Sequence, residues 1–116
     1  MRIAICDDEK SMGQILEEKV KKLLPDAVVE KYLSGDDLIS SGFKPDILFM
    51  DIQMPGKDGM ETARIVRQNN KDMILIFVTA VEEYVFQAFD VGAFHYLVKP
   101  FSDDKFEEVV KRAIKT

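Results

Sequence analysis

The chain has 116 residues, of which 47% are hydrophobic, and a formal net charge of -5 at pH 7. This length and composition suit one compact core, so we expect residues 1–116 to fold as a single domain. No apolar run approaches the roughly 18 residues of a membrane span, so we expect no membrane partner. The negative charge and the lack of a Lys/Arg cluster argue against nucleic-acid binding by this domain itself.

Cysteine usage and the N-terminal sequence indicate the cytoplasm. Cys6 is the only cysteine, so no internal disulfide or structural zinc site can form. The N-terminus has no signal-peptide pattern. We interpret Cys6 as a small buried apolar residue.

Short apolar strands alternate with amphipathic helices along the chain. The first strand, residues 2–6, runs into Asp7-Asp8-Glu9, three acids that a buried strand could not continue through. We expect Ser11 to cap the first helix and Pro25 to end it. The later elements are a strand over 27–33, a short helix from a Ser34 cap through 39, a strand over 46–50, a helix over 60–68, a strand over 73–78, a helix over 82–91, a strand over 95–98 and a last helix capped by Ser102.

The stretch over residues 46–59 is the centre of the sequence. Four consecutive apolar residues suit a strand buried on both faces, and Pro55 and Gly56 then prevent its continuation. Asp51 therefore lies at the carboxyl end of a strand, where ligands collect in an open parallel sheet. The alternative interpretation is an Asp that only initiates a turn.

Five alternating strands and helices predict an α/β fold, a doubly wound (βα)5 five-stranded parallel sheet of the flavodoxin-like type. The commonest strand order for such a chain is 2-1-3-4-5, which brings Asp7, Asp8 and Asp51 together. Their repulsion, about 4 kcal/mol per pair at an effective dielectric of about 20, calls for protons or a cation. Oxygen ligands with open positions for water suit Mg²⁺. Thr79 and Lys99 follow two other strands at the same edge.

A carboxylate, a divalent cation, a hydroxyl and an amine are the groups that phosphoryl transfer to an Asp requires. Over all 116 residues the chain resembles the receiver domain of two-component response regulators. The resemblance rests on motifs at strand ends, which are Asp7-Asp8-Glu9, Met50-Asp51-Ile-Gln-Met-Pro-Gly, Val78-Thr79-Ala80 and Tyr96-Leu-Val-Lys99-Pro100-Phe101. The tract over 82–96 is most similar to receivers joined to LytTR-type DNA-binding domains.

The resemblance implies a phosphorylation-dependent signalling switch. Asp51 is then the acceptor of a phosphoryl group from the phosphohistidine of a sensor histidine kinase. Mg²⁺ is expected to be held by Asp8, Asp51 and the backbone carbonyl of Gln53, with Asp7 acting through water.

The same resemblance assigns the switch residues. Lys99 is expected to pair with the phosphate and to be joined to Pro100 by a cis peptide bond. Thr79 would contact a phosphoryl oxygen and move toward it, while Tyr96 fills the vacated space. The state of the site would thereby reach the surface of the fourth helix, fifth strand and fifth helix.

The expected fourth helix carries a wide apolar stripe. A helical wheel places Val85, Ala88 and Phe89 on one face, with Tyr84 and Phe86 on opposite flanks. A helix that covers one sheet needs a narrower stripe. We therefore expect Tyr84 or Phe86 to be exposed and to contribute to an output surface or to a homodimer on phosphorylation. The alternative is that neighbouring helices cover both flanks.

Three alternatives to this function make different demands on the sequence. The chain is either a stand-alone receiver or a part of a longer regulator with a DNA-binding output domain. A small phosphatase or phosphotransferase that forms an aspartyl-phosphate would carry a second Asp two residues after the nucleophile. Gln53 stands there and cannot transfer a proton, so we expect no enzyme beyond slow self-dephosphorylation. A flavodoxin would carry a phosphate-binding loop after the first strand, where acids stand instead.

Overall fold

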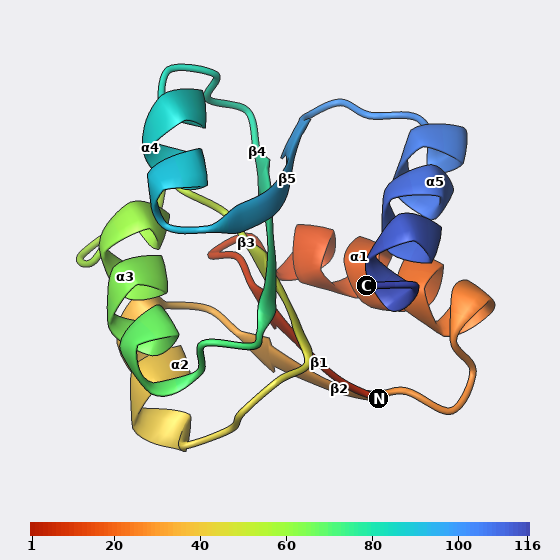
Figure 1. Ribbon diagram of the computed structural model, residues 1–116, viewed down its shortest axis with the longest axis horizontal. Coiled ribbons are helices and arrows are strands. Elements are labelled where there is room, and N and C mark those ends of the chain that lie inside the picture. Colours follow the sequence, from red (N-terminus) through yellow and green to blue (C-terminus); the bar gives the residue numbers. More distant parts are fainter.

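The structure is a computed structural model that describes residues 1–116. Five parallel strands alternate with five helices, and the strands are ordered β2-β1-β3-β4-β5 (Figure 1). The predicted α/β fold and strand order are therefore confirmed. The strands are β1 (Arg2–Cys6), β2 (Val28–Tyr32), β3 (Ile47–Met50), β4 (Ile74–Thr79) and β5 (Ala93–Val98).

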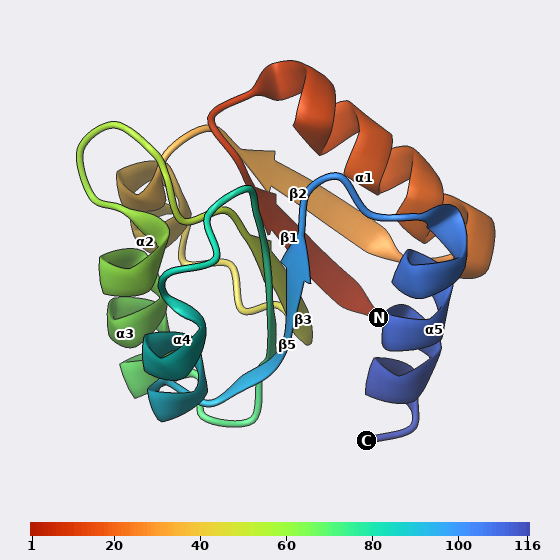
Figure 2. The ribbon, with the colours of Figure 1, turned by 90° about the horizontal axis from the view of Figure 1, so that it is seen from above.

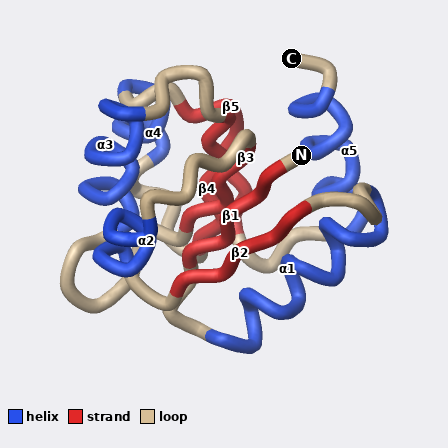
Figure 3. The backbone as a smooth tube through the Cα atoms, turned by 90° about the horizontal axis from the view of Figure 1, so that it is seen from below, coloured by secondary structure: helices blue, strands red, loops and turns tan.

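Helices cover both faces of the sheet, as Figures 2 and 3 show from opposite sides. One face is covered by α1 (Lys10–Leu23) and α5 (Asp103–Ile114), and the other by α2 (Gly35–Ser41), α3 (Gly59–Asn69) and α4 (Val85–Asp90). Alternate residues of each strand face opposite layers, so Ile5 packs with α1 and α5 while Cys6 packs with α2 and α3. None of the helices is both long and apolar enough to cross a membrane.

The central strand β3 is buried along its whole length, as its apolar sequence predicts. Phe49 stacks on Phe106 of α5 with ring centroids 5.6 Å apart, while Leu48 and Met50 pack against the opposite layer. Each such side chain contributes about 1.5–3 kcal/mol through removal from water. The strand that carries Asp51 is therefore held firmly between two cores.

Two of the three predicted helix caps are confirmed. The Ser34 and Ser102 hydroxyls accept hydrogen bonds from backbone N–H groups in the first turns of α2 and α5. The predicted Ser11 cap is wrong, because α1 begins at Lys10 and Glu9 occupies the cap position. Asp7 Oδ1 accepts from the Glu9 N–H at 2.9 Å and orders the turn, so the helix begins one residue before Ser11.

Helix α4 departs most from prediction. It covers residues 85–90 instead of 82–91, because residues 83–84 form a turn, and β5 begins at Ala93 instead of at residue 95. Ala88 is its only buried residue. The helical wheel placed Phe89 toward the core, but its side chain is 57% exposed. The helix has only six residues, and of these only Ala88 is buried against the sheet.

Candidate functional site

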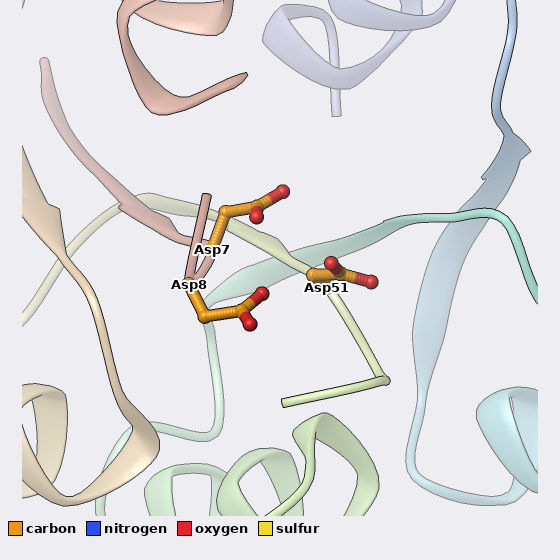
Figure 4. A group of neighbouring side chains, drawn as sticks. All are labelled: Asp7, Asp8 and Asp51. Atoms are coloured by element: carbon orange, nitrogen blue, oxygen red, sulfur yellow. The ribbon is translucent and has the colours of Figure 1, made fainter. Parts of the chain in front are cut away.

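The three acids converge because their strands are neighbours. In the parallel pairing of β1 and β3, Cys6 lies opposite Met50, and the Asp51 N–H donates to the Cys6 carbonyl at 2.9 Å. The next residues along the two strands are Asp7 and Asp51. Carboxylate oxygens of Asp7, Asp8 and Asp51 all lie within 4.8 Å of one another (Figure 4).

Two of these carboxylates are buried and one is open to water. Asp7 is 2% and Asp51 6% exposed, whereas Asp8 is an exposed residue. Burial raises the pKa of Asp7, although the Glu9 N–H and the Lys99 ammonium act in the opposite direction. The cluster is thus costly to ionise without a positive charge beside it.

Lys99, at the end of β5, supplies such a charge. Its Nζ lies 2.9 Å from Asp7 Oδ2 and 3.3 Å from Asp51 Oδ2. Burial alone would lower the pKa of Lys99, but the hydrogen bond to Asp7 and the charge of Asp51 raise it. The Lys99 ammonium therefore offsets part of the repulsion that the sequence predicts among the three carboxylates. The peptide bond from Lys99 to Pro100 is cis.

Thr79 and Tyr96 both bind the backbone of Val81. Thr79 is fully buried at the end of β4, and its Oγ1 accepts from the Val81 N–H at 3.3 Å. The Tyr96 hydroxyl donates to the Val81 carbonyl. Thr79, at the end of β4, and Tyr96, within the neighbouring strand β5, are thereby connected through one residue of the β4–α4 loop.

The remaining predicted residues lie around this edge. Gln53 is exposed in the loop after β3, and it lines an open hollow of about 390 Å³ together with Tyr84 and Asp58. Tyr84 is partly buried against the core under α3 and α4, whereas Phe86 is 81% exposed. The two residues predicted for the interface are therefore in different environments.

Gly59 is a positioning residue that the sequence did not reveal. A Cβ at this position would lie 1.9 Å from the Asp51 carbonyl oxygen, and its N–H donates to the Ile52 carbonyl at 2.8 Å. In the sequence this glycine is only the last residue of the stretch over 46–59, and nothing local shows its contact with Asp51. The backbone of Asp51 therefore rests directly on the first residue of α3.

Cys6 takes no part in the chemistry of the site. Burial, followed by the charges of Asp7 and Asp51, raises the pKa of its thiol to about 12. The thiol therefore stays protonated at neutral pH and cannot act as a nucleophile.

The donor set fits a small hard cation. Carboxylate oxygens are the ligands that Mg²⁺ prefers, and the exposed Asp8 leaves room for the water ligands that Mg²⁺ retains. Asp7 and Asp51 supply further oxygens from the same edge of the sheet.

The fold and the acidic edge together define a receiver-type α/β protein. The structure of the BeF3-activated DrrB receiver domain matches with a TM-score of 0.89 and 26% identity, over 99% of this chain and 97% of that one. The response regulator protein TrrA from Thermotoga maritima, in complex with Mg²⁺-BeF, matches with a TM-score of 0.84 and 28% identity, over 97% of each chain.

Residues 3–111 match the family model of the response regulator receiver domain, and the chain therefore belongs to this family. The sensory transduction protein LytT of Oceanobacillus iheyensis is 35% identical over 100% of this chain and 49% of its own length. The positive alginate biosynthesis regulatory protein of Pseudomonas aeruginosa is 35% identical over 97% of this chain and 47% of its length. The chain thus spans about half the length of these relatives. Its family role is regulatory and not catalytic.

Proposed function

We propose that residues 1–116 form one receiver domain in which Asp51 accepts a phosphoryl group from the phosphohistidine of a sensor histidine kinase. The observation that carries this proposal is the convergence of three carboxylates and the Lys99 ammonium at the carboxyl edge of the sheet. Asp51 follows the most central strand, so its backbone is fixed while its side chain faces that edge. The proposal also draws on the family match and on the Mg²⁺-BeF complex of the similar protein TrrA.

The residues that would hold Mg²⁺ are Asp8, Asp51 and the backbone carbonyl of Gln53, with Asp7 acting through water. When bound, the ion offsets negative charge on the phosphoryl oxygens and on the clustered carboxylates. The chain itself contributes the placement of the carboxylates, which the pairing of β1 with β3 determines.

In the transfer step, a carboxylate oxygen of Asp51 attacks the phosphorus. A P–O bond forms as the P–N bond to the histidine breaks, and the electron pair of that bond stays on the histidine nitrogen. The product is an acyl phosphate on Asp51. Lys99, which lies 3.3 Å from Asp51 in the unmodified site, then donates to a phosphoryl oxygen in place of the carboxylate.

The switch would act through Val81. The Thr79 hydroxyl accepts from the Val81 N–H and keeps its own hydrogen free for a phosphoryl oxygen. Movement of Thr79 toward the phosphate displaces Val81, and with it the hydrogen bond from Tyr96. The signal then reaches the α4-β5-α5 surface, to which Tyr84 and Phe86 belong.

The proposed readout is a change in association at that surface. Phe86 and Phe89 expose apolar area on α4, which favours a homodimer on phosphorylation or contact with an output domain. We propose an output domain that binds DNA, as the resemblance of the tract over 82–96 to LytTR-type receivers implies, while the net charge of -5 supports no nucleic-acid contact by residues 1–116. A cytoplasmic location completes the proposal.

Intact-mass spectrometry after incubation with acetyl phosphate tests the proposed function. We expect one phosphoryl group to be added in Mg²⁺ and very little in EDTA, because the carboxylates repel an anionic donor unless a cation is bound. Asp51→Asn should abolish the addition. Equal modification in EDTA, or of the Asp51→Asn protein, would contradict the proposal.

A further inference from the structure

Arg67, in the last turn of α3, connects two loops at the amino edge of β4 and β5. Its Nε donates to the Val91 carbonyl at 3.2 Å, and Nη2 donates to the Gly92 carbonyl at 2.9 Å. Its Nη1 donates to three carbonyls of the loop before β4, those of Asn70 (3.4 Å), Lys71 (3.2 Å) and Met73. The guanidinium therefore bridges the loop before β4 and the turn before β5.

The positive charge of Arg67 is balanced by backbone carbonyls alone. Arg67 takes part in no salt bridge. Burial lowers the pKa of its guanidinium, yet an arginine stays charged in proteins. The carbonyls that it binds follow the carboxyl ends of α3 and α4, where the helix dipoles carry partial negative charge. Arg67 thus holds together the carboxyl ends of α3 and α4, two helices that lie side by side in Figures 2 and 3.

Helix α4 depends on such contacts, because it has six residues, no side-chain cap and only Ala88 buried. A helix this short does not persist on its own. At its carboxyl end it is attached through Arg67. Before its amino end, the chain is attached at Val81, whose N–H donates to the Thr79 hydroxyl and whose carbonyl accepts from the Tyr96 hydroxyl. The two ends of α4 are therefore held by different residues. Thr79 and Tyr96, near the amino end, belong to the proposed switch, whereas Arg67, at the carboxyl end, does not.

We infer that Arg67 is a positioning residue that anchors the carboxyl end of α4, so that a change at Thr79 and Tyr96 displaces only the amino end of the helix. This inference concerns the regulation of the proposed switch and rests on the proposed function. The fixed end is the turn over Val91 and Gly92, and the movable end is the β4–α4 loop. Arg67 itself lies at the edge of the sheet opposite Asp51, so it contacts no phosphoryl group.

Amide hydrogen exchange measured by NMR tests the anchor. The Val91 and Gly92 N–H groups bond within the last turn of α4, so their exchange rates report on that turn. We expect Arg67→Gln to raise both rates by about tenfold or more, since the turn loses both of its charged hydrogen bonds. Arg67→Lys should raise them less, because one ammonium keeps the charge but cannot reach both loops.

The matched control is Arg64→Gln on the exposed side of the same helix, which should leave both rates unchanged. Unchanged rates in Arg67→Gln, or an equal rise in Arg64→Gln, would overturn the inference. If Arg67→Gln does not fold, Arg67→Lys carries the same comparison against Arg64→Gln.

The regulatory part is tested with Mg²⁺ and beryllofluoride, a phosphoryl mimic, on the ¹⁵N-labelled native chain. We expect large amide shift changes at Thr79 and Val81 and small ones at Val91 and Gly92, whereas in Arg67→Gln the changes extend to the latter pair. Changes in the native protein as large at Gly92 as at Val81 would overturn the anchor. Unchanged shifts at Asp51 and Thr79 would instead contradict the proposed function, and the exchange comparison would still decide the role of Arg67.

Discussion

The acidic edge of the sheet, where Asp7, Asp8, Asp51 and Lys99 meet, and α4 are neighbouring regions with different supports. Asp51 follows a strand that is buried on both faces, and its backbone rests on Gly59. Helix α4 has six residues, buries only Ala88 and exposes Phe86 and Phe89. The first region is held by the core of the sheet, whereas the second is held by Ala88, by the partly buried Tyr84 and Val91 that flank it, and by hydrogen bonds at its ends.

This difference indicates how a rigid acidic site could change the position of α4 at the surface. A site that transfers a phosphoryl group needs fixed groups, while a reporting element needs a second arrangement of similar free energy. Val81 lies between the two regions and bonds to Thr79 and Tyr96. In the proposed switch, a displacement at the site would therefore act on α4, which buries only Ala88.

The largest expected effect is on the rigid side of the comparison. Gly59→Ala should destabilise the protein by about 3 kcal/mol or more, because the new Cβ would overlap the Asp51 carbonyl oxygen, which is backbone and cannot move aside. Urea unfolding measures the change. Gly13→Ala is the matched control, since its Cβ meets only Lys31 Cδ at 3.8 Å, and it should stabilise α1 by about 0.5–1 kcal/mol. Equal effects of the two substitutions would refute the close packing at Asp51.

A smaller effect is expected at the charges of the site. Lys99→Met should cost about 2–3 kcal/mol in EDTA, because it leaves the buried Asp7 without its cation. The double variant Lys99→Met/Asp7→Asn should regain most of this loss in the same urea melts. By contrast, Asp8→Ala or Asp51→Asn leaves the Lys99–Asp7 pair intact and removes repulsion, so neither should be less stable than the native protein.

On the weakly held side, Phe86→Ser should change the free energy of unfolding by less than about 0.5 kcal/mol, because the ring is 81% exposed. The same substitution should weaken association in Mg²⁺ and beryllofluoride, as measured by sedimentation velocity. Tyr84→Ser should weaken association as well but also cost stability, since Tyr84 is partly buried.

Val28→Ser is the control for that experiment, because Val28 is exposed on β2 at the far edge of the sheet. It should leave association unchanged. A native protein that stays monomeric with and without beryllofluoride would remove self-association from the account.

The smallest effect concerns His95 on β5. Burial lowers its pKa below the usual value of 6.5, as do Lys105 and Arg112, while Glu108 acts in the opposite direction. The unfolded chain therefore binds a proton at His95 more tightly than the folded chain does. The contribution of neutral His95 to the free energy of unfolding is complete above about pH 6.5 and is lost as the pH falls toward the pKa of the folded state. His95→Gln should therefore lose less stability than the native protein between about pH 7 and 5. Parallel pH profiles of the two proteins would contradict this.

The sequence is most informative about the acidic edge of the sheet. Apolar strands that end in Asp7, Asp51, Thr79 and Lys99 predict one shared edge, because parallel strands all point their carboxyl ends the same way. It is least informative about α4. Helix propensity over residues 82–91 does not reveal the turn before Val85 or the exposure of Phe89, which depend on tertiary contacts.

The contacts of Arg67 are also not predictable from the sequence. Its partners at Val91 and Gly92 lie 24 and 25 residues further along the chain, and in the sequence it reads only as a charged residue near the end of a helix. Nothing local distinguishes it from Arg64. Contacts between loops at the same edge of a sheet become visible only once the strands are placed.

The most direct measurement locates the phosphoryl group. After incubation with acetyl phosphate and Mg²⁺, borohydride reduces an acyl phosphate on an Asp to homoserine, and tandem mass spectrometry then identifies the residue. We predict homoserine at position 51, with Asp7 and Asp8 unchanged, because of the three acids only Asp51 follows the central strand β3, and its carboxylate lies 3.3 Å from the Lys99 ammonium. Homoserine at Asp7 or Asp8, or none at position 51 in a chain that has gained a phosphoryl group, would contradict it.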